Sequence, residues 1–165
     1  MSVKIVIGVD PGLSGAIAIV DSQYTVLATT VMTVHGHEMD LTSLANWLEA
    51  EIESNPYPVP IIACIEKVSA MPHQGVKSMF TFGFNTGAIH GILASFSIPR
   101  YMVTPQIWQK AVLSFTNRGD KQASVNFCRR IYPDLNLLAT ERSKKPHTGM
   151  ADAICIARYA IMTLL

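Results

Sequence analysis

The first 32 residues contain three apolar, β-branched segments that are joined by very short links. The segments cover residues 3–9, 15–20 and 24–32, so the links hold only five and three residues. A parallel crossover needs about a dozen residues or more, so these strands must run antiparallel to one another. The start of the chain therefore predicts an antiparallel meander whose first strand ends at Asp10.

Helix and strand patterns alternate after the third strand, which is typical of parallel pairing. We predict strands over residues 61–65, ending at Glu66, and over 100–104, with a loop over 67–78. We predict helices over residues 41–52, with Asp40 or Thr42 as N-cap, and over 79–96. Three further helices should cover residues 106–113 after Pro105, the segment from an Asp120 cap to Tyr132, and residues 150–164. The pattern predicts one α/β domain over residues 1–165. Its five-stranded mixed sheet should have strand order 3-2-1-4-5 and helices on both faces.

The composition is that of a chain with a packed core, since 49% of the 165 residues are hydrophobic and 15% are charged. It excludes a disordered tail, a collagen-like chain and a coiled coil. No apolar run is long enough to cross a membrane. The first residues lack the apolar stretch of a signal peptide. Cys64, Cys128 and Cys155 lie far apart in apolar segments, so we expect reduced core cysteines in a cytoplasmic protein.

The charge is distributed unevenly along the chain. Residues 1–99 carry three Lys and Arg against eight Asp and Glu, a net −5, whereas residues 100–165 carry ten against four, a net +6. A basic half of this kind suits a polyanion such as nucleic acid. A solvated helix face explains the same asymmetry, and the composition alone leaves both interpretations open.

Three acidic residues have positions that could bring them together. Asp10 and Glu66 end two strands that we expect to be neighbours, and Asp152 lies in the first turn of the last helix. Converging carboxylates repel one another unless cations neutralise them, and oxygen ligands suit Mg²⁺ or Mn²⁺. Two such ions about 4 Å apart activate water for phosphodiester hydrolysis. Taken singly, each acid could instead be a turn residue, an exposed strand end or a partner of the helix dipole.

Three segments, in this order, resemble the RuvC-like Holliday junction resolvases of the ribonuclease H superfamily. They are IGVDPGLSGAIA at residues 7–18, CIEKV at 64–68 and GMADAICIA at 149–157. Residues 77–87, 103–110 and 119–123 look most like the bacteriophage-type branch of that family. The resemblance covers nearly the whole chain, and the ordered set of segments is more specific than any one of them.

The resemblance implies a metal-dependent endonuclease that acts in DNA recombination and repair. Such an enzyme would cut four-way DNA junctions by paired symmetric nicks as a homodimer, with two Mg²⁺ ions per site and Mn²⁺ as a substitute. Asp10, Glu66 and Asp152 would be the catalytic metal ligands. The family usually has a fourth ligand just before the last Asp, but Gly149 at that place has no side chain. His147 is the nearest candidate for the fourth ligand, with a solvated or phosphate-contacting residue as the alternative.

The resemblance also suggests residues that contact DNA. Lys121 matches a basic residue near the scissile phosphate, where its charge could stabilise the transition state; a solvated lysine is the alternative. Phe80 is our choice for an aromatic wedge between unstacked bases. The predicted DNA contacts are Gln74, Lys77, Phe80, Arg118, Lys121, Arg142, Lys144 and Lys145. We expect the helix over residues 79–96 to form the dimer face, and Trp47 and Trp108 to pack in the core.

Alternatives from other classes remain open at this stage. The turn after the first strand also occurs in actin-like ATPases and sugar kinases, which need a second lobe and a much longer chain. A ribonuclease H-fold enzyme acting on RNA would share the acids and metals but would need no dimer. A non-catalytic junction-binding module would bind branched DNA and leave it uncut.

Overall fold

The fold is built on a five-stranded mixed sheet with the strand order β3-β2-β1-β6-β7. The strands are β1 (Ile5–Asp10), β2 (Ala16–Asp21), β3 (Val26–Val31), β6 (Ile61–Glu66) and β7 (Arg100–Val103). The first three run antiparallel, and β1–β6 and β6–β7 are parallel. This order confirms the prediction of 3-2-1-4-5. The last two strands have higher numbers only because a separate short hairpin, of β4 (Val34–His35) and β5 (Glu38–Met39), precedes them in the chain.

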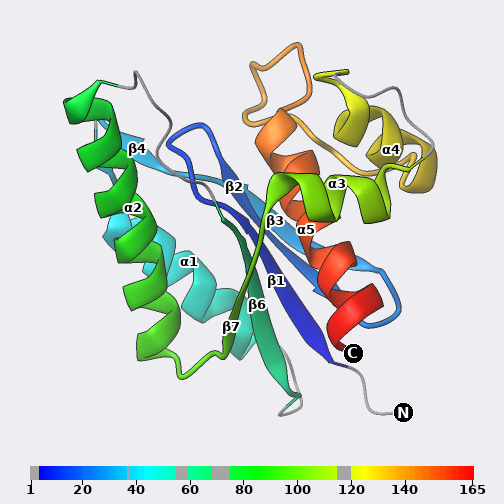
Figure 1. Cartoon of the computed structure of the whole chain (residues 1–165), viewed down its shortest axis with the longest axis horizontal. Helices are drawn as coiled ribbons and strands as arrows, with labels where there is room; N and C mark the ends of the chain where they lie inside the picture. Colours follow the sequence, from blue (N-terminus) through cyan, green and yellow to red (C-terminus); the bar gives the residue numbers. More distant parts are fainter. Residues whose placement is uncertain (1–3, 37, 55–58, 68–74, 115–119) are drawn as a thin grey trace.

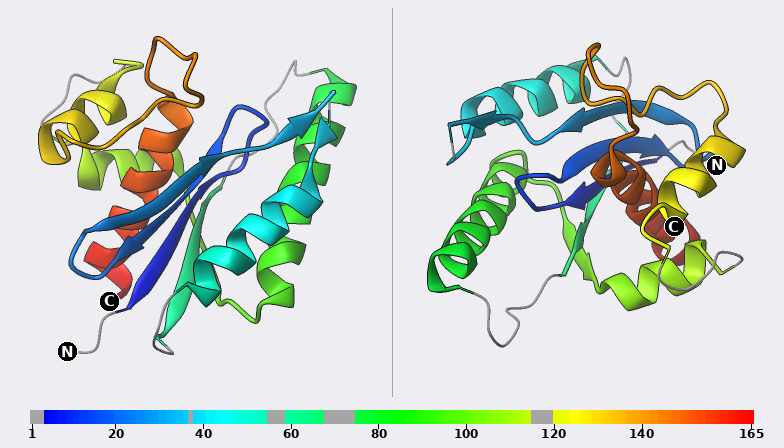
Figure 2. Two further views of the ribbon diagram at one scale, coloured as in Figure 1. Left: turned by 180° about the vertical axis from the view of Figure 1, so that it is seen from behind. Right: turned by 90° about the horizontal axis from the view of Figure 1, so that it is seen from above.

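Five helices cover the two faces of this sheet in the computed structural model, which describes the chain except residues 1–3, 37, 55–58, 68–74 and 115–119. They are α1 (Leu41–Glu53), α2 (Val76–Ser95), α3 (Pro105–Val112), α4 (Ala123–Ile131) and α5 (Thr148–Leu164). Helices α1 and α2 lie on one side, and α3, α4 and α5 lie on the other (Figures 1 and 2). Among the described residues, no helix is both long and apolar enough to span a membrane.

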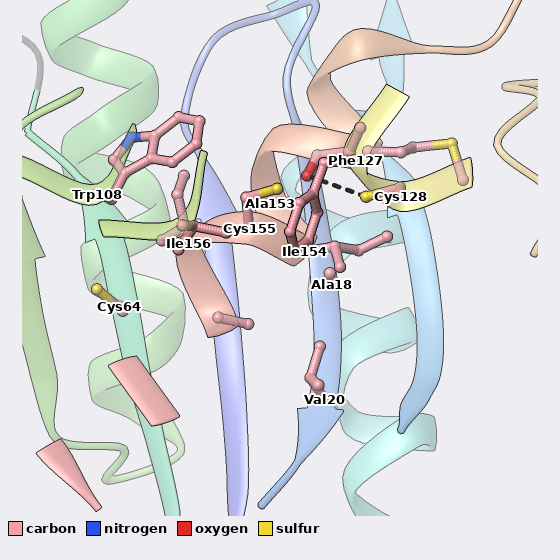
Figure 3. Close-up of a cluster of buried hydrophobic side chains, with 14 of the residues drawn as sticks. Ala18, Val20, Cys64, Trp108, Phe127, Cys128, Ala153, Ile154, Cys155 and Ile156 are labelled. Carbon is pink, nitrogen blue, oxygen red and sulfur yellow. Dashed lines mark hydrogen bonds between the residues drawn. The ribbon is translucent and has the colours of Figure 1, made fainter. Parts of the chain in front are cut away.

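Each face of the sheet has its own apolar core. One cluster joins alternate residues of β1 and β2, including Val6 and Ala18, to α3, α4 and α5. The other joins the intervening residues, including Ile7 and Ile17, to α1 and α2. Figure 3 shows part of the first cluster, with Trp108 beside side chains of α5. This alternation follows from the period of two in a strand that is buried on both sides.

The sequence-based predictions about the core and two helix starts are confirmed. All three cysteines are free and buried, Trp108 is buried, and Trp47 packs against the cluster of α1 and α2. The Asp40 side chain caps α1 by accepting the Ser43 N–H at 3.0 Å. Pro105 occupies the first turn of α3, where its missing N–H costs no hydrogen bond.

Four predicted boundaries are wrong. Helix α2 begins at Val76, so the predicted loop over residues 67–78 extends three residues too far. Helix α4 begins at Ala123 with Gln122 as its cap, because the Asp120 side chain accepts the Gln122 N–H within a separate turn. These errors arise where turn hydrogen bonds, rather than apolar spacing, decide the ends of elements.

The third boundary error concerns the turn before β3, which begins at Val26 and not at Tyr24. Tyr24 has a φ of 68°, so it belongs to the turn. The Asp21 side chain accepts the N–H groups of Gln23 and Thr25 at 2.8 Å each and closes that turn. The hairpin of β4 and β5 was also not predicted, since each strand has only two residues.

The fourth boundary error concerns α5, which begins at Thr148, two residues before its predicted start. The His147 side chain caps the helix there by accepting the Met150 N–H. Asp152 therefore lies just past the first turn of α5, and the prediction that it lies within that turn is wrong.

Candidate active site

Asp10 is the last residue of β1, next to the tight turn that leads into β2. The backbone N–H of Gly12 donates a hydrogen bond to the Asp10 carboxylate. Gly15 closes the turn, since a Cβ there would lie 2.0 Å from the Asp10 carbonyl oxygen. The β1–β2 turn, which follows the end of β1, lies at the end of the sheet that is uppermost in Figure 1.

Glu66 ends β6 at the same edge of the sheet. The parallel register pairs Val9 with Ile65, so the next residue along each strand, Asp10 or Glu66, ends at the same level. The Trp108 indole Nε1–H donates to the Glu66 Oε1 atom at 2.8 Å. One oxygen of this carboxylate is thus held by α3.

Asp152 comes to this edge from α5, which packs against β1 and β2. A Cβ at Gly8 of β1 would lie 2.0 Å from the Ala153 carbonyl oxygen, so the helix backbone rests directly on the strand. Asp152 precedes Ala153 and receives a hydrogen bond from the buried Ser124 hydroxyl of α4. The charges of Glu66 and Asp152 both raise the pKa of Asp10, so these two acids lie within electrostatic reach of Asp10.

Burial raises the pKa of all three acids, and the charges of neighbouring acids raise it further at Asp10 and Glu66. Burial, then the charges of Glu66 and Asp152, raise the pKa of Asp10 from 3.8 to about 7. Burial and the charge of Asp152 raise the pKa of Glu66, while the Trp108 bond lowers it. Burial raises the pKa of Asp152, while Ser124 and the charge of His147 lower it. The site therefore holds more negative charge than its own surroundings offset.

A divalent cation fits this donor set by its chemistry. Carboxylate oxygens are the ligands that Mg²⁺ and Mn²⁺ prefer, and a cation would relieve the repulsion that raises the pKa of Asp10. Within the described part of the chain, however, no three His, Cys, Asp or Glu side chains are close enough together to form a ready ligand group. The acids share an edge and an electrostatic environment, and their oxygens would have to approach one another around an ion.

His147 is the N-cap of α5, and its Nδ1 accepts the Met150 N–H at 3.3 Å. Burial lowers the pKa of His147, while the charge of Asp152 raises it, so the ring lies within electrostatic reach of the site. Gly149 has no room for a side chain, because a Cβ there would lie 2.8 Å from the Ser14 carbonyl oxygen. The position where the resembling family has its fourth ligand is thus sterically closed here.

The predicted DNA-contacting residues that the structure describes are all exposed. They are Lys77, Phe80, Lys121, Arg142, Lys144 and Lys145. Lys77 lies in the first turn of α2, and the last three belong to the segment that leads into α5. Figure 1 places the start of α2 and this segment at the same end of the molecule as the β1–β2 turn. Gln74 and Arg118 lie outside the described residues.

Two contacts at the site were not anticipated from the sequence. Trp108 was expected only as a core residue, yet its N–H reaches Glu66. The contact could have been expected, because a buried indole N–H usually has a hydrogen-bond partner. Trp108 also follows a strand that ends at the same edge of the sheet as Glu66. Ser124 was not considered, although it is a polar residue on the buried face of α4 beside Val125 and Cys128.

Comparison with solved structures places this arrangement in a known fold. Thermus thermophilus RuvC in complex with a Holliday junction substrate is similar, with a TM-score of 0.63 and 15% sequence identity over 94% of this chain and 92% of that one. A second T. thermophilus RuvC structure has a TM-score of 0.60 and 15% identity over 96% and 95% of the two chains. The chain has a RuvC-like fold.

No family model matches the chain, and no curated protein matches its sequence. The RuvC-like fold, a member of the ribonuclease H-like class, confirms the predicted fold class.

The raised pKa of Asp10 predicts how Asp10→Asn changes stability with pH when no metal is bound. The folded carboxyl keeps its proton up to about pH 7 but the unfolded one loses it near 3.8, so this group makes folding less favourable as pH rises between these values. We expect Asp10→Asn to match the wild type near pH 4 and to exceed it by about 2–4 kcal/mol at pH 8. Urea unfolding in EDTA at both pH values measures this difference.

Asp134→Asn is the matched control, because Asp134 is an exposed loop residue. Its free energy of unfolding should stay within about 0.5 kcal/mol of the wild type at both pH values. An advantage of Asp10→Asn that is equal at pH 4 and pH 8 would contradict the raised pKa.

Proposed function

We propose that this protein is a metal-dependent DNA endonuclease that resolves four-way junctions by paired symmetric nicks. The observation that supports the proposal is the position of Asp10, Glu66 and Asp152 at one edge of a RuvC-like fold. Burial raises the pKa of each acid there, and repulsion between acids adds to the rise at Asp10 and Glu66. The structurally similar T. thermophilus RuvC was solved with a Holliday junction substrate. The resemblance of its sequence segments to RuvC-like resolvases favours a role in DNA recombination or repair.

In the proposed site, Asp10, Glu66 and Asp152 would hold Mg²⁺, with two ions per site and Mn²⁺ as a substitute. Bound ions of this kind lower the pKa of a water molecule and stabilise the charge that develops on a phosphate. The Gly12 N–H and the Ser124 hydroxyl each hold one of the carboxylates. These donors are uncharged, so they orient the acids and leave the negative charge of the acids for a cation.

His147 is the proposed additional ligand, and its present role constrains how it could serve. Because Nδ1 accepts the Met150 N–H, the proton of the neutral ring resides on Nε2. Ligation through Nε2 would require that proton to move to Nδ1, which can then no longer accept a hydrogen bond. In this proposal, metal binding and capping of α5 by His147 exclude each other.

The proposed DNA surface surrounds the acidic edge. Arg142, Lys144 and Lys145 are exposed in the segment directly before α5, and such cations bind phosphates partly by releasing counterions. Lys121 is exposed beside α4 and would approach the scissile phosphate. Phe80 is 75% exposed, as a base wedge requires. The resemblance adds Gln74 and Arg118 to these contacts.

The proposed homodimer would form through α2. Beyond the proposed wedge Phe80, this helix exposes Phe84, which is 57% accessible. Gly83, Gly87 and Gly91 are also exposed, and a Cβ at any of them would meet nothing within 4 Å. Three glycines in a helix cost about 1 kcal/mol each relative to alanine. Small residues at this spacing allow a second helix to approach closely, and two symmetric nicks require two active sites.

The decisive test of the proposed activity incubates the protein with a four-way junction, a flap, a linear duplex and an RNA–DNA hybrid, each in Mg²⁺, Mn²⁺ or EDTA. Denaturing gels should reveal paired symmetric nicks in the junction with either metal and no cleavage in EDTA. Asp10→Asn should slow cleavage about 1,000-fold or more, equivalent to about 4 kcal/mol of barrier. It should still bind the junction in gel-shift assays, because a repulsive charge is removed.

Asp134→Asn again serves as the control and should cut like the wild type. Cleavage of the hybrid alone would move the assignment to an RNA-processing enzyme. Junction binding without cleavage in either metal would indicate a binding module, and full activity of Asp10→Asn would refute the assigned site.

The role of His147 is tested by His147→Asn, because asparagine is a strong N-cap but lacks the imidazole. We expect an unchanged melting temperature and a half-saturating Mg²⁺ concentration for cleavage that rises at least about 10-fold. His147→Ala should lose both the cap and the ligand. An unchanged Mg²⁺ requirement in His147→Asn would leave His147 only as a helix cap.

The dimer face is tested by Gly87→Leu, because the space around Gly87 is open within one protomer. The substitution should leave folding intact or stabilise the helix by up to about 1 kcal/mol, yet block close helix contact. Sedimentation equilibrium should show a dimer for the wild type and a monomer for the variant. Ala50→Leu, at an exposed position of α1, is the control and should remain dimeric. A dimeric Gly87→Leu protein would exclude α2 as the interface.

A further inference from the structure

Trp108 combines almost complete burial with a polar contact to the candidate active site. Its side chain is 1% exposed and belongs to the apolar cluster beneath α5 (Figure 3). Its Nε1–H donates to the Glu66 Oε1 atom at 2.8 Å. The ring therefore packs in the core while its one polar atom reaches a carboxylate at the edge of the sheet.

The backbone around this contact fixes the indole relative to Glu66. Glu66 pairs with Val103 across β6 and β7, and the Lys67 N–H donates to the Val103 carbonyl oxygen at 2.7 Å. Thr104 then caps α3, and Trp108 lies one turn into that helix. Because this hydrogen bond joins the ends of β6 and β7, the first turn of α3 brings the indole N–H of Trp108 close to the carboxylate of Glu66.

The chemistry of the donor suits a metal ligand. An indole N–H only donates, never titrates and carries no charge. A lysine or arginine in this place would orient Glu66 equally well but would neutralise it. The indole instead occupies one carboxylate oxygen and leaves the other, with the negative charge, for a cation. Removing a group that holds a metal ligand in this way typically weakens metal affinity by about 10–100-fold.

We propose that Trp108 is a positioning residue whose indole N–H holds Oε1 of Glu66, so that the other oxygen is presented to a divalent ion. This inference rests on the proposed function and extends it to a residue that touches neither the metal nor the DNA. The proposal implies that the fluorescence of Trp108 changes when a metal ion binds, since the ion would alter the charge around Glu66, the hydrogen-bond acceptor of the indole.

The first experiment uses Trp47→Phe, which leaves Trp108 as the only tryptophan of the two in the chain. Titration with Mg²⁺ should change the Trp108 fluorescence, with the same midpoint as Mg²⁺ binding measured by isothermal titration calorimetry. The change should vanish when Glu66→Ala is added. Trp108 fluorescence that stays constant while Mg²⁺ binds would overturn the proposal.

The second experiment uses Trp108→Phe, which keeps an aromatic ring in the core and removes the N–H. We expect its calorimetric Kd for Mg²⁺ to rise by about 10–100-fold, and its half-saturating Mg²⁺ concentration for cleavage to rise in parallel. Trp47→Phe should bind Mg²⁺ as the wild type does. A Trp108→Phe protein with a lower melting temperature but an unchanged Kd would assign Trp108 a packing role and overturn the proposal.

The outcomes separate this inference from the proposed function. Wild-type protein that cuts junctions, together with a Trp108→Phe variant of unchanged Mg²⁺ affinity, would overturn only the positioning role. If Mg²⁺ changes the Trp108 fluorescence of the Trp47→Phe protein but the wild type cuts no branched DNA, only the proposed activity would be overturned. Absence of Mg²⁺ binding at millimolar concentrations would overturn both.

Discussion

The direct packing of α5 on the sheet is the constraint on which the candidate site depends. The helix meets β1 at Gly8, where the Ala153 carbonyl oxygen occupies the place of a side chain. It meets the β1–β2 turn at Gly149, which lies against the backbone of Ser14 and Gly15. Because two glycines remove the usual side-chain layer, Asp152 comes much closer to the strand ends than ordinary helix–sheet packing would allow. A larger residue at either glycine would move the helix away.

The same packing creates an electrostatic cost. It brings a third carboxylate to an edge that already holds Asp10 and Glu66, and it removes water from all three, so the pKa of each acid rises. The donors that hold the acids, the Gly12 N–H, the Trp108 indole and the Ser124 hydroxyl, carry no charge. The repulsion and the burial of the acids lower the stability of the fold, and a bound cation would offset this cost.

The packing at Gly149 also explains a departure from the resembling family. The helix cannot carry a ligand at that position, because the turn backbone fills the space. His147 lies two residues earlier, at the N-cap of the helix. A metal ligand and a helix cap have different requirements for the ring proton. If His147 holds a metal as we propose, metal binding would weaken the cap on the first turn of α5.

Much of this protein follows from rules that act over short stretches of sequence. Short links force the first strands to run antiparallel, alternating helix and strand patterns favour parallel pairing, and strand ends place Asp10 and Glu66 at one edge. These features depend on chain reach and periodicity, which are local, and the sheet order was therefore predictable. The start of α2 and the hairpin of β4 and β5 escaped prediction because turn hydrogen bonds and two-residue strands leave little periodic signal.

The sequence by itself determined the fold class, the sheet order and the positions of Asp10 and Glu66 at two neighbouring strand ends, because each depends on residue spacing along the chain. Only the tertiary structure decided that Trp108 reaches Glu66, that His147 caps α5 and that Gly149 has no room for a ligand. It also decided that the apolar face of α2 with Phe80 and Phe84 is exposed. These features depend on which distant backbone lies opposite a side chain, and that information is absent from any single segment.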